Sequence, residues 1–187
     1  MTVQEDALGR LAGFLDRASV PDMVIGGIAN IVWGEPRATL DIDVTVLVEA
    51  GEIGAFIDRA SVEYRVLIQN PVEFIRETRV LPVEDRTGVR IDVVFGLLPF
   101  EEEAVKRAVG VEIAGRSIRV CTAEDLILMK IISDRPRDLA DARAIVGRRR
   151  QSLDRKYLEP RIAEMARLLE RDDVVTRWRE WNESASS

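Results

Sequence analysis

The stretch GGIANIVWGEPRATLDIDV, residues 26–44, decides how we interpret the chain. It opens with two glycines after a short apolar run, passes through a helical segment and a loop, and ends in a strand that carries Asp41 and Asp43. Alternate residues of a strand point to one face, so these carboxylates are expected side by side. Adjacent carboxylates repel each other, and a divalent cation offsets that repulsion. The alternative is an ordinary solvent-facing strand.

A second strand repeats this pattern. In RIDVVF, residues 90–95, Asp92 lies between apolar neighbours. If the two strands are neighbours, about 4.8 Å apart, Asp92 joins Asp41 and Asp43 in one cluster. Such a cluster can hold two Mg²⁺ ions roughly 3.5–4 Å apart, which activate an attacking oxygen and stabilise leaving pyrophosphate. We therefore predict all three as catalytic residues and metal ligands, provided that the strands are adjacent.

The segment before the acidic strand offers candidates for nucleotide binding. Gly26 and Gly27 let the backbone approach a ligand, and the following helix N-terminus favours phosphate, although a plain strand-to-helix turn explains them too. Arg37 lies near the strand start and can reach a phosphate or stay a surface arginine. Thr39 shares the face of Asp41 if the strand starts early. We predict these four residues as nucleotide-binding.

Lys130 is the next candidate, because its helix is apolar nearly all round. A lysine there either extends to the surface or meets an anion. We predict that it is a catalytic residue that contacts a triphosphate. Asp138 and Asp141, close to one side of the next helix, can orient Lys130 and are included among the nucleotide-binding residues.

Composition limits the chemistry. The chain has 187 residues, a net charge of -6, no histidine and one cysteine, Cys121. Ser-His-Asp catalysis, His-ligated metals, multi-cysteine zinc sites and internal disulfides are therefore excluded. Catalysis would rely on carboxylates, lysine, arginine and backbone groups. The arginines at 148–150 suit either a helix C-terminus or a nucleic-acid contact.

No segment has the pattern of a signal peptide or a membrane span, so we expect a cytoplasmic protein without a membrane partner. Hydrophobic periodicity predicts an α/β (α+β) core over residues 1–120 and a helical part over 121–187. The segment 71–77 is ambiguous, with a helix start at Pro71. The strands are expected at 23–25, 40–48, 66–68 and 89–95, with a hairpin over 111–120. The helices are expected at 4–18, 28–33, 51–60, 101–108, 122–133, 136–150, 153–170 and 172–182.

Residues 26–44 resemble the signature of the DNA polymerase β nucleotidyltransferase superfamily, in which Gly-Gly or Gly-Ser and a short helix precede Asp-x-Asp on a strand. Lys130 and Arg137-Asp-Leu-Ala-Asp141 resemble downstream motifs of its AbiEii/AbiGii toxin-like branch. The resemblance covers residues 22–146. It implies the nucleotidyltransferase fold, a small mixed sheet flanked by helices with a helical C-terminal part.

The resemblance also implies roles. The glycines would hold the triphosphate, Asp41 and Asp43 would bind both metals, and Asp92 would bind the catalytic metal and help to deprotonate the acceptor hydroxyl. Lys130 would contact the phosphates. Gly27 departs from family members that carry serine at this position, so no hydroxyl is available there.

We therefore expect a Mg²⁺-dependent nucleotidyltransferase that uses an NTP as substrate and moves its NMP to an acceptor hydroxyl. An RNA end such as that of tRNA is the expected acceptor, and a cognate antitoxin is a further partner that the branch implies. One alternative is a small-molecule adenylyltransferase of the antibiotic type, which would need an acidic pocket. Another is a noncatalytic nucleotide-binding module on the same fold. The sequence names neither the base nor the acceptor.

Overall fold

The computed structural model describes residues 2–184, which form two compact units. The sheet unit comprises the chain up to Ile28 together with Ala38–Cys121. The helical unit comprises Ala29–Arg37 and the chain from Thr122 onward. The boundary predicted at residue 120 did not assign residues 29–37 to the helical unit. The chain passes from the sheet unit to the helical unit within the helix Gly26–Trp33.

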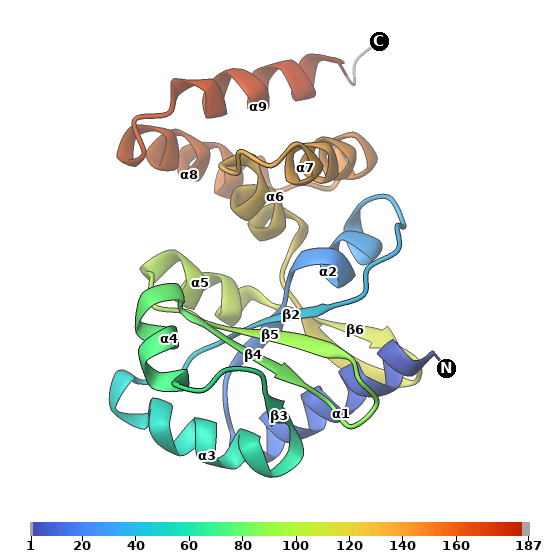
Figure 1. The fold of residues 1–187 in the computed structure, drawn as a ribbon. Helices are drawn as coiled ribbons and strands as arrows, with labels where there is room; N and C mark the ends of the chain where they lie inside the picture. The colour runs from blue at the N-terminus through green and yellow to red at the C-terminus, as the bar shows by residue number, and fades with distance from the viewer. Residues whose placement is uncertain (1, 185–187) are drawn as a thin grey trace. The chain divides into compact units, whose positions relative to one another are not determined.

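The strands of the sheet unit form one mixed sheet in the described part of the chain, in the order β3-β4-β5-β2-β1-β7-β6 (Figure 1). The pairs β2–β5 and β1–β7 are parallel, and the other neighbours are antiparallel. The strands are β1 (Asp22–Val24), β2 (Ile42–Val46), β3 (Arg65–Val66), β4 (Val80–Glu84), β5 (Arg90–Phe95), β6 (Val109–Ile113) and β7 (Arg116–Val120).

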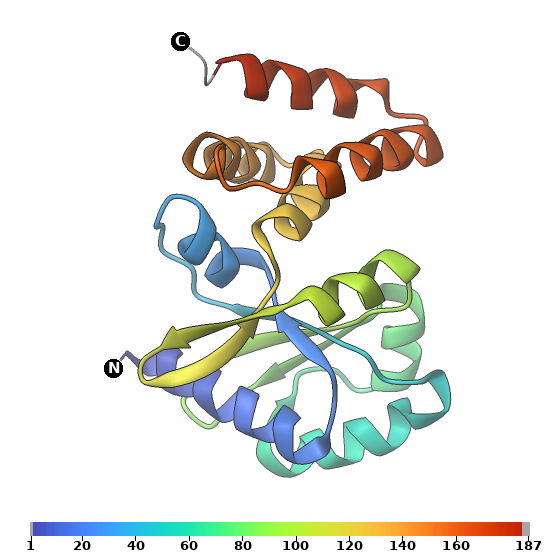
Figure 2. The same cartoon turned by 180° about the vertical axis from the view of Figure 1, so that it is seen from behind.

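Helices cover both faces of this sheet. On one face, an aromatic cluster joins α1, α3 and β5: Phe14 and Phe56 meet edge to face at 6.0 Å, and Phe56 and Phe95 at 5.6 Å. Both views place α5 on the other side of the sheet from α1 and α3 (Figures 1 and 2). The helical elements of this unit are α1 (Val3–Ala18), the 3₁₀ turn η1 (Ala50–Glu52), α3 (Ile53–Glu63), α4 (Pro71–Thr78) and α5 (Pro99–Arg107), with the first turn of α2 (Gly26–Trp33).

The helical unit has its own core around α6 (Ala123–Ile131). Thr122 caps this helix by accepting the backbone N–H of Asp125 at 3.1 Å. The buried carboxylate of Asp125 accepts the hydroxyl of Tyr157, which ties α6 to α8. A buried carboxylate needs such donors, because desolvation without hydrogen bonds is costly. The remaining helices are α7 (Pro136–Arg149), α8 (Arg155–Leu168) and α9 (Asp172–Ser184).

The predicted fold class is confirmed, while some local predictions were wrong. Strand β2 begins at Ile42, later than the predicted start at residue 40. Strand β4 was not predicted at all, because it contains Pro82, a residue that weakens a strand pattern. In the structure β4 pairs with β3 on one side and with β5 on the other. The ambiguous segment is helix α4, with Pro71 in its first turn. Within residues 2–184, no helix is both long and apolar enough to cross a membrane.

Candidate active site

The site is built on the parallel pair β2 and β5. In this register Asp43 is the direct partner of Asp92, so the adjacency of the two strands, the condition on which the predicted cluster depended, is met. Residues that are paired across a sheet point to the same face, so both carboxylates stand on one face of the sheet. The flanking Ile42 and Ile91 point to the opposite face, where both are fully buried. Burial of these apolar neighbours fixes the register, since a shift of one residue would exchange the two faces.

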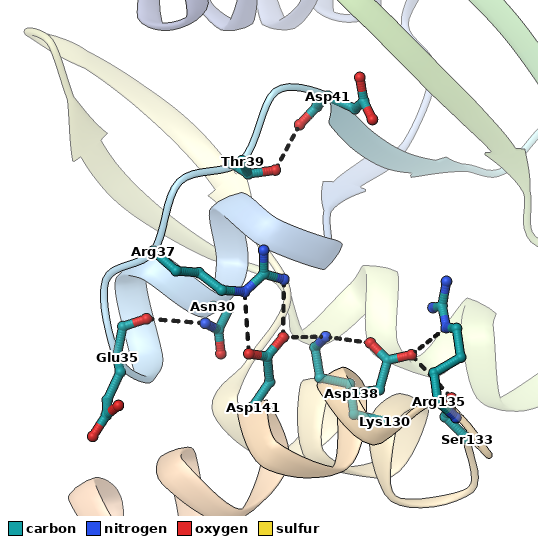
Figure 3. Close-up of polar contacts among 10 residues, drawn as sticks. All are labelled: Asn30, Glu35, Arg37, Thr39, Asp41, Lys130, Ser133, Arg135, Asp138 and Asp141. Atoms are coloured by element: carbon teal, nitrogen blue, oxygen red, sulfur yellow. Dashed lines mark hydrogen bonds and ion pairs between the residues drawn. The ribbon is translucent and has the colours of Figure 1, made fainter.

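Asp41 lies one residue before β2 and is exposed. Its backbone carbonyl accepts the hydroxyl of Thr39 at 3.3 Å (Figure 3). The same carbonyl accepts the side-chain amide of Gln4 at 3.4 Å. Because β2 starts after Asp41, Thr39 belongs to the preceding loop, and the early strand start that would have placed it on the face of Asp41 is not present. Within residues 2–184 no group of three ligating side chains is close enough to form a ready-made metal site.

Sequence inspection missed Arg90, which lies among these carboxylates. Its Nε donates to Asp92 Oδ1 at 3.0 Å. The hydrogen bond and charge of Asp92, with further contributions from Asp41 and Asp43, raise the pKa of the Arg90 guanidinium above its ordinary value. The signal was present in the sequence, since Arg90 is two residues before Asp92 and shares its face of the strand. The negative charge of the three aspartates is therefore balanced in part by the guanidinium of Arg90.

The two glycines have a clear steric reason. Gly26 adopts φ +61°, and a Cβ at this position would lie 2.0 Å from Asp43 Oδ2. A Cβ at Gly27 would lie 2.4 Å from Thr39 Oγ1. The missing side chains thus make room for Asp43 and Thr39 beside the start of α2. Whether the same backbone also holds a phosphate stays a prediction.

Lys130 is buried in the helical unit between two carboxylates (Figure 3). Its Nζ donates to Asp138 Oδ1 and to Asp141 Oδ2, both at 2.8 Å. The structure thus brings together the three residues that were predicted to act together. The anions that a buried lysine requires are supplied by the unit itself, and contact with a triphosphate stays a prediction.

The two acids are held in their charged form. Burial by itself would raise the pKa of Asp138, but hydrogen bonds from Lys130, Ser133 and Arg135 outweigh it and hold that pKa below its ordinary value. For Asp141 the hydrogen bonds of Arg37 and Lys130 likewise outweigh burial and lower the pKa. The network therefore carries two ionised carboxylates at neutral pH.

Arg37 belongs to this network through a bidentate contact. Its Nε and Nη2 donate to the two carboxylate oxygens of Asp141 at 3.1 and 2.9 Å. Bidentate arginine–carboxylate pairs are strong and geometrically specific. Upstream, the side chain of the buried Asn30 donates to the Glu35 carbonyl at 3.1 Å. Sequence inspection missed Asn30. The segment 30–37 is thus anchored within the helical unit before the chain enters β2.

The basic end of α7 holds the end of α2. Arg148 donates to the Gly34 carbonyl at 3.1 Å, and Arg149 donates to the Val32 carbonyl at 3.2 Å. The Arg149 guanidinium also lies 5.0 Å from the centre of the Trp33 ring. Cations at a helix C-terminus are favoured by its dipole and by its unpaired carbonyls. These two arginines therefore hold the C-terminal end of α2, and they also lie in the last turn of α7, where a cation is favoured.

A mixed sheet with paired aspartates after a Gly-Gly helix start is the arrangement that the resemblance to nucleotidyltransferases implied, and the fold is that of this class of proteins. A family model described as "Nucleotidyltransferase of unknown function (DUF6036)" matches residues 2–186. The chain therefore belongs to this nucleotidyltransferase family. The AbiEii/AbiGii branch is a finer assignment than this match supports. No curated protein matches the chain.

Solved structures agree on the fold. The antibiotic-resistance factor ANT(2″)-Ia, in complex with adenylyl-2″-tobramycin, is 20% identical with a TM-score of 0.60; the match covers 89% of this chain and 99% of that chain. A nucleotidyltransferase-like antigen from Paracoccidioides brasiliensis is 14% identical with a TM-score of 0.54, covering 92% and 90%. The lincosamide adenylyltransferase LnuA, bound to lincomycin, is 13% identical with a TM-score of 0.52, covering 78% and 96%.

Proposed function

We propose that this protein transfers the NMP of an NTP to the hydroxyl of an RNA acceptor in a reaction that depends on Mg²⁺. The observation that carries the proposal is the register of β2 and β5, which places Asp43 directly beside Asp92. Two carboxylates on one sheet face, beside a glycine that leaves room for one of them, form a suitable anchor for a metal–triphosphate complex.

The donor set fits Mg²⁺. This ion is usually bound through one or two carboxylates and fills its octahedron with water and substrate phosphates. Asp43 and Asp92 supply that pair, and the exposed Asp41 is available at the strand start as the third ligand for a second ion. When bound, the ions would neutralise phosphate charge and activate the acceptor oxygen. Arg90 balances part of the carboxylate charge until then.

In this proposal each residue of the site has its own role in the transfer. Asp92 Oδ2 takes the proton of the acceptor hydroxyl, since Oδ1 already accepts from Arg90. The acceptor oxygen then forms a bond to the α-phosphorus, the bond from that phosphorus to the bridging oxygen breaks, and pyrophosphate leaves. Gly26 and Gly27 would face the triphosphate at the start of α2, where backbone N–H groups favour anions. Arg37, Thr39 and Lys130 stay predicted nucleotide contacts.

Two classes of acceptor hydroxyl are candidates. An RNA end, such as that of tRNA, and a cognate antitoxin follow from the resemblance to the toxin-like branch. The fold is shared with adenylyltransferases bound to antibiotics or their products, so a small-molecule hydroxyl is the second candidate. A cationic antibiotic would need an acidic pocket. The basic groove described in the next subsection favours an anionic acceptor instead.

The test is incubation of the purified protein with each of the four α-labelled NTPs, Mg²⁺ and total RNA. Wild type should label RNA, and Asp43→Asn or Asp92→Asn should lower the rate on the order of a hundredfold or more, because each loses a site charge. The Asp41→Ala/Asp43→Ala double variant should be inactive. Asp58→Asn, an exposed aspartate on α3, is the matched control and should retain activity.

The outcomes separate the candidates. A labelled RNA band with wild type alone identifies the transferase and its acceptor. Label on an aminoglycoside or lincosamide but none on RNA would replace the RNA acceptor by a small molecule. Tight NTP binding without any product, unchanged in Asp92→Asn, would instead indicate a noncatalytic binding module.

A further inference from the structure

The helical unit contains an open groove of about 830 Å³. One side is formed by α7, and the lining also includes Arg177 and Trp181 of α9 together with Glu35. This volume lies toward the upper end of the range for small-ligand sites. The groove involves none of the site carboxylates. Part of the groove is lined by small residues of α7, which take up little space: Ala140, Ala144 and Gly147.

The lining is basic although the chain is acidic. Among residues 2–184, the charged residues that line the groove are Arg143, Arg148 and Arg177 with one acid, Glu35, which gives a local charge of +2 (three arginines minus one glutamate). The whole chain carries a net charge of -6. A local excess of cations on an acidic protein attracts anions and repels the cationic amines of an aminoglycoside.

Two of these arginines keep charge available for a ligand. Arg143 is exposed and makes no hydrogen bond or ion pair within residues 2–184. Arg148 donates to the carbonyl of Gly34, which is a neutral group, and within the described part of the chain it forms no ion pair. Arg177 differs, because its Nη2 pairs with Asp173 at 2.6 Å. The groove therefore presents two available cations from one helix, opposite an aromatic ring.

We propose that this groove binds single-stranded RNA, with a base stacked on Trp181 and successive phosphates on Arg143 and Arg148. Proteins bind single strands by combining a cationic track with aromatic side chains on which bases stack. Arg143 and Arg148 are a step of five residues apart, about 7.5 Å along the helix axis and about 140° around it, and both side chains line the groove. The inference rests on the proposed function to the extent that this RNA is its acceptor.

The experiment measures binding without NTP, by fluorescence anisotropy of a labelled single-stranded RNA of roughly 12 nucleotides. Arg143→Glu/Arg148→Glu should weaken binding at least tenfold. It should also flatten the plot of log affinity against log salt by about 1.4, from two lost phosphate contacts. Trp181→Ala should weaken binding about 5- to 100-fold, whereas Trp181→Phe keeps a stacking ring and should stay near wild type.

Two controls separate RNA contact from loss of folding. Glu35→Gln should tighten binding, a gain that a damaged fold does not produce. Arg167→Glu reverses an exposed charge on α8 outside the groove and should change affinity little. Equal losses in Arg167→Glu and the groove variant, or none in either, would overturn the proposal. Groove-dependent binding of poly-glutamate with RNA binding unaffected would also overturn it, in favour of an acidic protein partner.

Asp43→Asn keeps this inference distinct from the proposed function. This variant should bind RNA as wild type does, although its transfer rate should fall on the order of a hundredfold or more. RNA labelling that is insensitive to the groove variants would refute the groove while leaving the transferase intact. RNA binding that depends on the groove, without any transfer by wild type, would support the groove and refute the proposed transferase.

Discussion

At the scale of single residues, Gly26 controls the placement of an acidic ligand. Its φ of +61° and the 2.0 Å between its missing Cβ and Asp43 Oδ2 exclude a side chain there. In the sequence, Gly26 can be explained as part of a strand-to-helix turn. The fold shows that its missing side chain makes room for Asp43 of β2, a candidate metal ligand.

Gly26→Ala should therefore impair catalysis more than it impairs folding. Backbone strain from positive φ costs about 1–2 kcal/mol, and displacement of Asp43 should lower the transfer rate on the order of a hundredfold. Gly88→Ala is the matched control, since Gly88 has φ +85° and nothing within 4 Å of its missing Cβ. Urea denaturation and labelled-NTP transfer check the pair. Equal activity in both variants would show that the position of Asp43 is not limiting.

At the scale of elements, local signals predicted most of the helices and strands, because apolar periodicity and caps act within a few residues. Thr122, for example, indicated the start of α6, and the cap is present. Strand β4 escaped prediction, because its order depends on pairing with β5, which sequence periodicity does not record. The contact of Arg37 with Asp141 joins residues far apart in the chain and was likewise not predicted.

The buried network that joins α6 and α7 gives a prediction for stability. Lys130→Met should destabilise the fold by about 3–5 kcal/mol at pH 7, because it leaves Asp138 and Asp141 as buried charges without their shared cation. Arg135→Ala removes another ion pair of Asp138. The Arg135 side chain is 81% exposed, so this loss should lower the free energy of unfolding by less than about 1 kcal/mol. Urea denaturation measures both. Similar costs for the two variants would contradict a buried role for Lys130.

The pH dependence of this difference has a definite sign. In wild type the folded pKa values of Asp138 and Asp141 are lowered, so their stabilisation is present above the ordinary carboxyl pKa of 3.8 and is lost as the pH falls through the lowered values. In Lys130→Met both carboxylates lose one hydrogen-bond donor and one positive charge while staying buried, so their folded pKa values should lie above those of wild type and protonation should relieve part of the cost. The deficit of the variant should shrink from pH 7 to pH 4. A constant deficit would indicate a loss of packing alone.

At the scale of the whole molecule, ligand binding should stabilise the chain through the sheet unit. Mg²⁺ with a nonhydrolysable NTP at about 100 times its Kd should add about 2.7 kcal/mol and raise the thermal midpoint by several degrees. EDTA should reverse the shift, and Asp43→Asn/Asp92→Asn should abolish it. Asp58→Asn should retain it. A full shift in the double variant would place the metal–nucleotide site elsewhere.

The sequence by itself determined the class of fold, the apolar pattern of its main elements and the acidic residues that mark the site, because these signals are local and periodic. It left open whether Asp92 belongs with Asp43. Tertiary structure decided this by pairing β2 with β5 in register, since strand order follows from long-range packing. It also revealed Arg90 beside Asp92, assigned 29–37 to the helical unit and gave Lys130 its two carboxylate partners. Each is a contact between side chains or segments that only a folded chain brings together.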